Sequence, residues 1–427
     1  MNTEKRLVVA SLLFLYASSC ASLKKSEPII GETKTKSTVE RNIERHVAGD
    51  ASLVTQAWTQ FGTKGEMIAR ALTIGGACPQ IKVDDNHLTM SMRGVPSETF
   101  SVNVCEVKVS EKAKSISIGD VKLSTLPAKV EKILVLGDTG CRIVKRKKDY
   151  IIQNCNDPVA WPFARLAKAA AEWGPDLVIH VGDYHYREAP CPENDSRCAG
   201  DISGDNWHSW QDDFFAPALP LLKKAPWVFV RGNHELCSRG GYGWFKFLDP
   251  NPFSEACVDK TDAYWVKFGE HMLAVIDSAE DSNIQPSLDS LQAPSSSLVW
   301  VALHRPFLTV GADDETSAKP SVLNDNLRSK VSAVFAGHQH QLSFNQFADA
   351  RPPELISGNS GSMLEPAPKI ANPSEIYKSF SQFGFLTLEK KSDQTWDMIE
   401  HDVSGDEMFH CTLTEVLGSK AKIDCGK

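Results

Sequence analysis

Three short apolar runs in the middle of this chain are each followed by a polar segment that begins with glycine. In the third case one arginine separates the run from its glycine. The runs and their segments are 133–136 with Gly137-Asp138-Thr139-Gly140, 177–181 with Gly182-Asp183-Tyr184-His185-Tyr186, and 227–230 with Gly232-Asn233-His234-Glu235. Short apolar runs bounded by glycine are typical of buried strands. Because neighbouring strands of an open α/β sheet deliver the residues at their carboxyl ends into one crevice, the polar side chains of these segments are predicted to converge.

Two later segments add histidines to the same pattern. Val301-Ala302-Leu303-His304 ends a fourth apolar run, and Gly337-His338-Gln339-His340 follows the short stretch 334–336. Each segment alone is a weak signal, since Gly-Asp and His-x-His are common. All five in one order between residues 137 and 340 are hard to produce by chance. Together they supply Asp, Tyr, Asn and His in ratios suited to two metal ions.

The residues around these segments predict an α/β fold. Helical spacing over 162–173 and 210–222 separates the first three strands, and strand-like runs become frequent beyond residue 260. Two packed sheets flanked by helices, an αββα sandwich, fit this better than one doubly wound sheet. We expect this domain to span 128–427. Ahead of it, alternating apolar residues over 46–127 predict a small all-β domain of immunoglobulin or fibronectin type, with nothing catalytic in it.

The N-terminus has the layout of an export signal. Lys5 and Arg6 precede an apolar stretch over 7–16, which is too short for a stable membrane-spanning helix. The small residues before Cys20 resemble a bacterial lipobox, so residues 1–20 are predicted to be a signal peptide and Cys20 to carry a lipid. Residues 21–45 are polar and predict a flexible tether. The expected location is the periplasm or the outer membrane, and plain secretion is the alternative.

Cysteine usage points the same way. Setting Cys20 aside from the eleven cysteines leaves ten, which fall as neighbours: Cys78 and Cys105, Cys141 and Cys155, Cys191 and Cys198, Cys237 and Cys257, Cys411 and Cys425. Five local disulfides in an oxidising compartment are the simplest interpretation, although spacing does not prove the connectivity. A thiolate metal site is the alternative, and no pair has the C-x-x-C spacing that would favour it.

The charge of the chain argues against a nucleic-acid surface. The formal net charge is −8, and the one basic cluster is Lys145-Arg146-Lys147-Lys148. A solvated loop is the favoured interpretation of this cluster. We therefore expect a small phosphoester as the partner and contact with a membrane only through the lipid at Cys20. The sequence does not indicate an oligomeric state.

The chemistry that such a residue set supports is phosphoester hydrolysis. Two cations about 3.5–4 Å apart acidify a bound water and neutralise the charge that develops on the phosphoryl oxygens. Placing them so close requires a shared anionic ligand. Asp183 is the predicted bridge, because it follows the second of the three strands.

The five segments resemble the calcineurin-like metallophosphoesterase superfamily and, within it, the purple acid phosphatases. Most of the superfamily has a His two residues after the first Asp, where this chain has Gly140. Purple acid phosphatases also lack that His, and they use a Tyr three residues after the second Asp, which is Tyr186 here. A phenolate is a hard anionic donor that prefers Fe³⁺, so the exchange also predicts the metal.

The resemblance implies a role for each residue of the site. The first ion is expected at Asp138, Tyr186, His340 and the bridge Asp183, and the second at Asn233, His304, His338 and the same bridge. The implied cofactors are Fe³⁺ with Fe²⁺, Zn²⁺ or Mn²⁺, and a metal-held hydroxide attacks phosphorus in line. His234 is expected to protonate the leaving oxygen. Glu235 is expected to orient His234 or a neighbouring backbone group.

Two departures from the family pattern remain. Relatives place further histidines after the Val-x-x-His segment to contact phosphate, and residues 305–309 contain none. His185 is a candidate replacement. Arg187 is a second candidate, because it resembles the phosphate-gripping Arg of protein serine/threonine phosphatases and a guanidinium matches two phosphate oxygens. A surface ion pair is the alternative for Arg187.

Other residues near the segments have two interpretations. Residues 358–361 either line the site or form an ordinary tight turn. Trp207, Trp210 and Trp244 either line a rim or pack in the core, and core packing is favoured. Residues 188–206, which contain Cys191 and Cys198, are a candidate loop over the pocket rim.

The predicted activity is a phosphomonoester hydrolase of acid-phosphatase type. A phosphodiesterase or nucleotidase with the same ligands is the nearest alternative. A non-catalytic metal-binding surface lipoprotein is a third interpretation, and the presence of both ligand sets with His234 argues against it, because a structural metal site needs neither open positions nor an acid.

Overall fold

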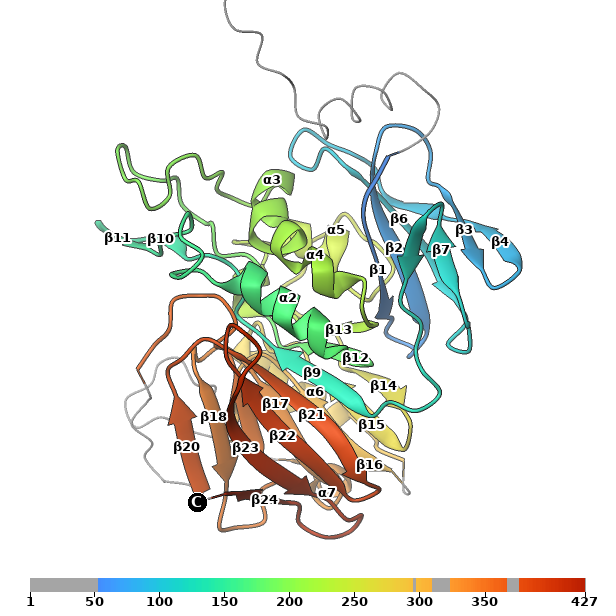
Figure 1. Ribbon diagram of the computed structural model, residues 1–427, viewed down its shortest axis with the longest axis vertical. Helices are drawn as coiled ribbons and strands as arrows, with labels where there is room; N and C mark the ends of the chain where they lie inside the picture. The colour runs from blue at the N-terminus through green and yellow to red at the C-terminus, as the bar shows by residue number, and fades with distance from the viewer. Residues whose placement is uncertain (1–52, 295–296, 309–322, 367–375, 427) are drawn as a thin grey trace, which may run out of the picture. The chain divides into compact units, whose positions relative to one another are not determined.

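The computed structural model describes residues 53–294, 297–308, 323–366 and 376–426 (Figure 1). The predicted signal peptide, Cys20 and the tether lie outside these ranges. Within them, no helix is both long enough and apolar enough to cross a membrane.

The first sheet contains eleven strands among the described residues, in the order β24-β23-β22-β21-β9-β12-β13-β1-β2-β6-β5. Their bounds are β1 (Leu53–Phe61), β2 (Met67–Ile74), β5 (Ser91–Gly94), β6 (Asn103–Val109), β9 (Lys132–Leu136), β12 (Leu177–His180), β13 (Trp227–Phe229), β21 (Phe385–Ser392), β22 (Thr395–His401), β23 (Glu407–Thr414) and β24 (Lys422–Cys425). Strands β9, β12 and β13 are parallel neighbours, so their carboxyl ends meet at one edge.

The second sheet has seven strands in the described part of the chain, in the order β14-β15-β16-β17-β19-β18-β20. Their bounds are β14 (Tyr264–Phe268), β15 (His271–Val275), β16 (Leu298–Ala302), β17 (Val331–Ala336), β18 (Leu342–Gln346), β19 (Glu354–Ser357) and β20 (Ile376–Phe380). Strands β15, β16, β17 and β19 run parallel to one another. Two smaller sheets are β4-β3-β7-β8 (Asn86–Thr89, Gln80–Val83, Ile116–Ile118, Val121–Leu123) and the hairpin β10-β11 (Ile143–Arg146, Asp149–Ile152).

Alternation along the strands builds the layers. In β9, Ile133 and Val135 face the core shared with the second sheet, whereas Leu134 and Leu136 face the helices. The helices on that face are α2 (Phe163–Trp173), α3 (Trp207–Trp210), a π-helical turn (Gln211–Phe215), α4 (Ala216–Leu222) and α5 (Gly241–Phe247). Helices α6 (Ile284–Ser290) and α7 (Asp325–Arg328) cover the outer face of the second sheet. The predicted αββα sandwich is confirmed.

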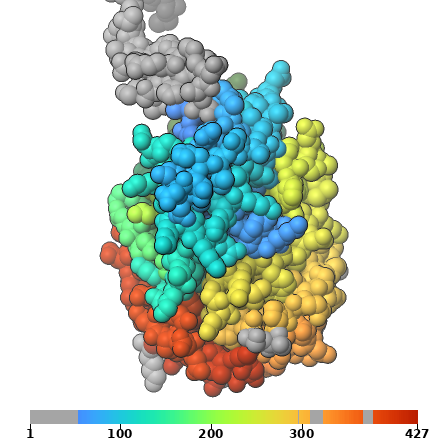
Figure 2. All heavy atoms as spheres, turned by 90° about the vertical axis from the view of Figure 1, so that its right-hand side faces the viewer, coloured from blue at the N-terminus to red at the C-terminus, as the bar shows by residue number. Residues whose placement is uncertain are grey.

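The N-terminal part, from Leu53 to Leu123, is built from strands, as predicted for an all-β region. Its first strand pairs in parallel with β13 through Gln60 and Trp227, so β1, β2, β6 and β5 extend the first sheet. Figure 2 shows these residues in blue against the yellow segment that contains α5. The domain boundary at residue 128 stays a prediction.

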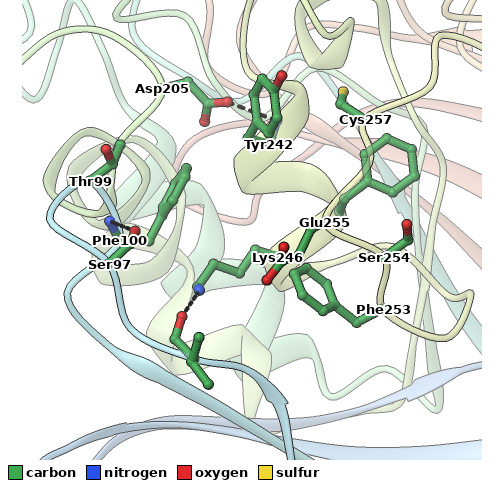
Figure 3. A pocket seen from close by; sticks show the side chains of 12 residues that line it. Ser97, Thr99, Phe100, Asp205, Tyr242, Lys246, Phe253, Ser254, Glu255 and Cys257 are labelled. Atoms are coloured by element: carbon green, nitrogen blue, oxygen red, sulfur yellow. Dashed lines mark hydrogen bonds between the residues drawn. The ribbon is translucent and has the colours of Figure 1, made fainter.

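Two buried arginines fasten the N-terminal strands to the end of α5. Arg70 donates to the carbonyl oxygens of Phe247 (2.8 Å) and Asp249 (2.7 Å), and Arg93 donates to that of Phe245 (2.9 Å). The last carbonyls of a helix lack partners within the helix, so cationic donors stabilise this end. Beside this contact, Val95, Phe100, Lys246 and Phe253 help to line a cavity of about 350 Å³, which no predicted ligand lines (Figure 3).

The described residues form five disulfides, and each joins the two cysteines that are neighbours in the chain. The bonds are Cys78–Cys105, Cys141–Cys155, Cys191–Cys198, Cys237–Cys257 and Cys411–Cys425. Such a density of disulfides indicates an exported protein.

Candidate metal centre

The predicted ligands lie where strands end. Asp138, Asp183 and Asn233 follow β9, β12 and β13, and the histidines His304, His338 and His340 follow β16 and β17. Three of these residues have a left-handed backbone, with φ of 57° at Asp138, 61° at Asp183 and 69° at His338. This conformation is costly for residues with a Cβ atom and gathers at functional sites.

Tyr186 is the centre of the first group. Its buried hydroxyl oxygen lies 2.9 Å from Oδ1 of Asp138, 2.8 Å from Oδ2 of Asp183 and 2.8 Å from Nε2 of His340. His340 Nδ1 donates to the carbonyl of Met363 (2.7 Å), which leaves Nε2 as an acceptor. A phenol has one proton and can satisfy one of these three acceptors. A shared cation would satisfy all of them, so this donor set fits a metal ion.

His304 is the centre of the second group. Its Nδ1 donates to the carbonyl of Val181 (2.8 Å), and Nε2 therefore faces Oδ1 of Asn233 at 3.0 Å and Oδ2 of Asp183 at 3.1 Å. His338 turns Nδ1 toward this nitrogen at 3.2 Å. Ligand atoms of Asp183, His304 and His338 lie within 4.8 Å of one another, which is close enough to hold one ion.

The electrostatics of both groups favour a cation. Burial lowers the pKa of His304, but Asp183 and Asp138 outweigh it and raise this pKa to about 9. Burial and the two carboxylates raise the pKa of Tyr186 well above its usual value. Both raised pKa values show that the carboxylates favour positive charge here, which a metal ion supplies as well as protons do, and Asp183, which contacts both groups, lies at their centre.

Glu235 ties the second and third ligand segments together. Its buried carboxylate accepts from the backbone nitrogens of Asp183 (3.1 Å), Tyr184 (2.8 Å) and Gly232 (2.9 Å). Glu235 thus orients neighbouring backbone groups, as predicted.

Asp213 ties the first segment to the second in the same way, and the sequence patterns did not single it out. Its Oδ1 accepts from the backbone nitrogen of Cys141 (3.0 Å), and its Oδ2 accepts from that of Tyr186 (2.7 Å). The residue is fully buried on the π-helical turn. Such turns often occur at functional sites, but the sequence carries no periodic signal for one.

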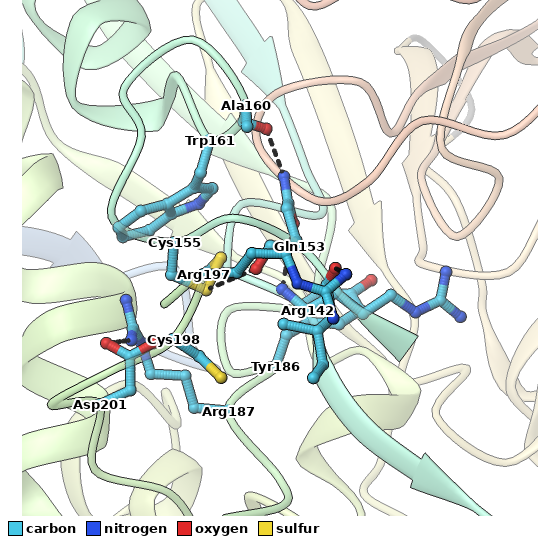
Figure 4. Close-up of a disulfide and its surroundings, with 12 residues drawn as sticks. Arg142, Gln153, Cys155, Ala160, Trp161, Tyr186, Arg187, Arg197, Cys198 and Asp201 are labelled. Atoms are coloured by element: carbon cyan, nitrogen blue, oxygen red, sulfur yellow. Dashed lines mark hydrogen bonds and ion pairs between the residues drawn. A yellow bond between two sulfur atoms is a disulfide. The ribbon is translucent and has the colours of Figure 1, made fainter. Parts of the chain in front are cut away.

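The structure does not bring Arg187 to the ligands. Its buried guanidinium pairs with Asp213 (Nε to Oδ1, 2.7 Å) and with Asp201, and it lies 5.2 Å over the ring of Trp161. Figure 4 shows Arg187 next to Asp201 and Cys198. This geometry counts against a phosphate grip. The predicted alternative also needs correction, since the ion pair is buried rather than on the surface.

His185 is likewise held away from the ligand groups. Its Nε2 lies 3.0 Å from Oγ of Ser209 and 3.1 Å from the carbonyl of Gly204, and its ring stacks on Trp210. Both partners belong to α3 or the loop before it, so His185 packs against that helix.

His234 lies beside both groups. Its ring packs on that of Tyr186 with centroids 3.7 Å apart, and Nε2 lies 3.8 Å from Oδ2 of Asp183. Nδ1 lies 2.8 Å from Oε1 of Glu188, and Nη2 of Arg239 lies 2.8 Å from both ring nitrogens. The pKa of His234 is lowered overall, chiefly by burial and also by Arg239, and Asp183 and Glu188 oppose this shift only in part. Glu188 and Arg239 were missed, because each lies a few residues outside a recognised segment.

The structure decides between the two interpretations that the sequence left open for the three tryptophans and for residues 358–361. Trp207, Trp210 and Trp244 are buried in the core beneath the helices, as favoured. Residues 358–361 line Asp138: a Cβ atom on Gly358 would lie 2.8 Å from its Oδ2, and the backbone nitrogen of Ser362 donates to its carbonyl (2.7 Å).

Comparison with known proteins agrees with this architecture. Residues 131–342 match the calcineurin-like phosphoesterase family. Among solved structures, a purple acid phosphatase, PPD1, from yellow lupin (Lupinus luteus) seeds aligns with 86% of this chain and 74% of its own at 14% identity and a TM-score of 0.57. PhoD aligns with 86% of this chain and 91% of its own at 11% identity and a TM-score of 0.52. At these identities the likeness is one of fold. No curated protein matches the chain significantly.

Proposed function

We propose that this chain, whose residues 131–342 match the calcineurin-like phosphoesterase family, is a metal-dependent hydrolase of phosphomonoesters with a dinuclear centre. The observation that carries the proposal is the Tyr186 hydroxyl, which has three acceptor atoms within 2.9 Å and one proton to give.

The first ion would be held by Asp138, Tyr186, His340 and the bridge Asp183. The second would be held by the same bridge and by three further residues: Asn233, His304 and His338. When bound, such a pair of cations acidifies water and neutralises charge on phosphoryl oxygens. A phenolate donor favours Fe³⁺ at the first position, with Fe²⁺, Zn²⁺ or Mn²⁺ at the second.

His234 would give its proton to the leaving oxygen of the ester. Its Nδ1 contacts Glu188, so Nε2 is the atom that faces Asp183 and the two groups of ligands. A carboxylate at one nitrogen sets the tautomer and ring orientation, and it opposes the lowering of the His234 pKa that burial causes.

The test is hydrolysis of p-nitrophenyl phosphate by protein reconstituted with iron and zinc. Asp183→Asn is expected to abolish the activity, because it removes the anionic bridge. If the reconstituted wild type shows no activity above background, the proposal is refuted and a non-catalytic surface protein is favoured.

A phosphodiesterase or nucleotidase could use the same ligands. Rates on p-nitrophenyl phosphate and on its bis ester separate the two activities. Faster cleavage of the bis ester would replace the monoesterase with a diesterase and leave the metal site intact.

The place of the protein outside the cytoplasm follows from its disulfides, and the lipid at Cys20 is part of the proposal. Mass spectrometry of the mature N-terminus is expected to show acylated Cys20. A free N-terminus created by cleavage at another position would favour plain secretion.

A further inference from the structure

A polar cavity of about 440 Å³ lies beside His234, on the side of the ring where Glu188 and Arg239 make their contacts. Besides these two residues, Lys145 and Asp205 contribute charged groups to its lining. A volume of this size suits a small polar ligand. None of the predicted metal ligands lines the cavity, so it is a separate space next to the predicted proton donor.

The two carboxylates of the cavity are engaged within the protein. Glu188 contacts His234 and Arg239 through Oε1. Asp205 accepts from the backbone nitrogens of Tyr242 (2.8 Å) and Gly243 (3.0 Å) and from the Trp210 indole (2.8 Å). Neither carboxylate needs a cation from outside.

Lys145 is engaged differently. Its side chain is exposed, its ammonium lies 5.4 Å from the ring centroid of Tyr150, and no carboxylate of the described residues pairs with it. The next three residues of the basic cluster are also exposed, and they have no ion pair in the described part of the chain. An unpaired cluster of this kind attracts anions, although the chain as a whole carries a formal charge of −8.

The hairpin β10-β11 that carries the cluster is firmly attached beside the site. The backbone nitrogen of Ile143 donates to the carbonyl of Tyr186 (3.0 Å), and that of Glu188 donates back to the carbonyl of Ile143 (3.0 Å). The Cys141–Cys155 disulfide closes the base of the hairpin. The backbone of the hairpin that carries Lys145 is therefore anchored beside Glu188.

We propose that this cavity binds a second anionic group carried by the leaving alcohol of the substrate, with Lys145 as its partner and Arg239 at the end nearest His234. The inference rests on the proposed phosphomonoesterase and names its substrate class: phosphomonoesters of alcohols that also carry a carboxylate or a phosphate. In the reaction, water adds its oxygen to phosphorus, the ester P–O bond breaks, and the leaving oxygen takes the proton of His234.

The test compares 6-phosphogluconate with sorbitol 6-phosphate, which share an open six-carbon chain and differ by a carboxylate in place of a CH₂OH group. The ratio of kcat/KM for the first to that for the second is measured in the wild type, Lys145→Gln, Lys145→Glu and the exposed control Lys82→Gln. We expect the ratio to fall about fivefold in Lys145→Gln, as for a partly exposed charge pair, further in Lys145→Glu, and not in the control.

An unchanged ratio in both Lys145 variants overturns the inference, and so does an equal loss on both substrates, which would indicate a structural defect. If the wild type hydrolyses p-nitrophenyl phosphate but neither of these two substrates, the inferred substrate class is wrong, and if it hydrolyses none of the three, the proposed function fails. The cavity is then tested separately by calorimetric titration with each compound. Tighter binding of 6-phosphogluconate that is lost in Lys145→Gln supports the anion site, and equal binding of the two compounds refutes it.

Discussion

A Cβ atom on Gly140 would lie 3.0 Å from Cδ2 of Tyr186 and 2.9 Å from its backbone nitrogen. A side chain at position 140 and the Tyr186 ring therefore compete for one space. This competition gives a physical reason for the exchange in the sequence, where a tyrosine three residues after Asp183 accompanies the absence of a histidine two residues after Asp138.

The first prediction follows from this contact. Gly140→Ala should displace Tyr186, because the added Cβ would also lie 2.6 Å from the backbone carbonyl of Tyr184. We expect a loss of about 1–3 kcal/mol in the free energy of unfolding, together with fewer bound metal ions per chain. Urea denaturation and metal analysis check this. Gly426→Ala is the control, since nothing lies within 4 Å of a Cβ atom there. Full metal content in Gly140→Ala would contradict the prediction.

Tyr186→Phe tests the phenolate itself. The oxidised, iron-loaded wild type is expected to absorb broadly in the green to yellow region, and the variant should lose this band, because it lacks the oxygen that contacts Asp138, Asp183 and His340. Visible spectra and metal analysis of the same samples provide the measurement. A colourless wild type that contains zinc or manganese and no iron would rule out a tyrosinate–Fe³⁺ centre.

Asp213→Asn should weaken the joint between the first two ligand segments. The variant leaves the buried Arg187 with Asp201 as its remaining carboxylate and places an amide where two backbone nitrogens donate. Breaking a buried pair costs about 3–5 kcal/mol, and metal binding should weaken as well. The neighbouring Asp212→Asn, at an exposed position, is the matched control. Equal stability of the two variants in urea would show that Asp213 is dispensable.

Glu400 should make stability depend on pH. Burial raises its pKa to about 8, and the hydrogen bond from Asn359 (2.7 Å) offsets only part of this effect. Between the ordinary glutamate pKa near 4.5 and pH 8, the folded state keeps a proton that the unfolded state has lost, so stability falls as pH rises. Glu400→Gln mimics the protonated form. Its free energy of unfolding relative to that of the wild type should therefore rise by about 3–5 kcal/mol between pH 4 and pH 8. Denaturation curves of both proteins at the two pH values provide the measurement. A stability difference between variant and wild type that is the same at pH 4 and at pH 8 would refute the prediction.

The five polar segments and the fold class could be predicted because their signals are local. Period-two and helical spacing reveal strands and helices, and ligands such as Asp138 and Asp183 follow their strands directly, so the sheet brings them together wherever the strands pair. The disulfides were accessible for the same reason, since each joins neighbouring cysteines, as Cys191 and Cys198 do.

The tertiary structure decided the contacts between segments that are distant in the chain. The pairing of Gln60 with Trp227, which carries the N-terminal strands into the first sheet, has no periodic signature. The ion-pair partners of Arg187 also depend on tertiary structure, because Asp213 reaches this arginine only once the π-helical turn has packed against the second ligand segment. Spacing along a chain shows which face of an element is buried, whereas the partner of a buried charge depends on how the elements pack.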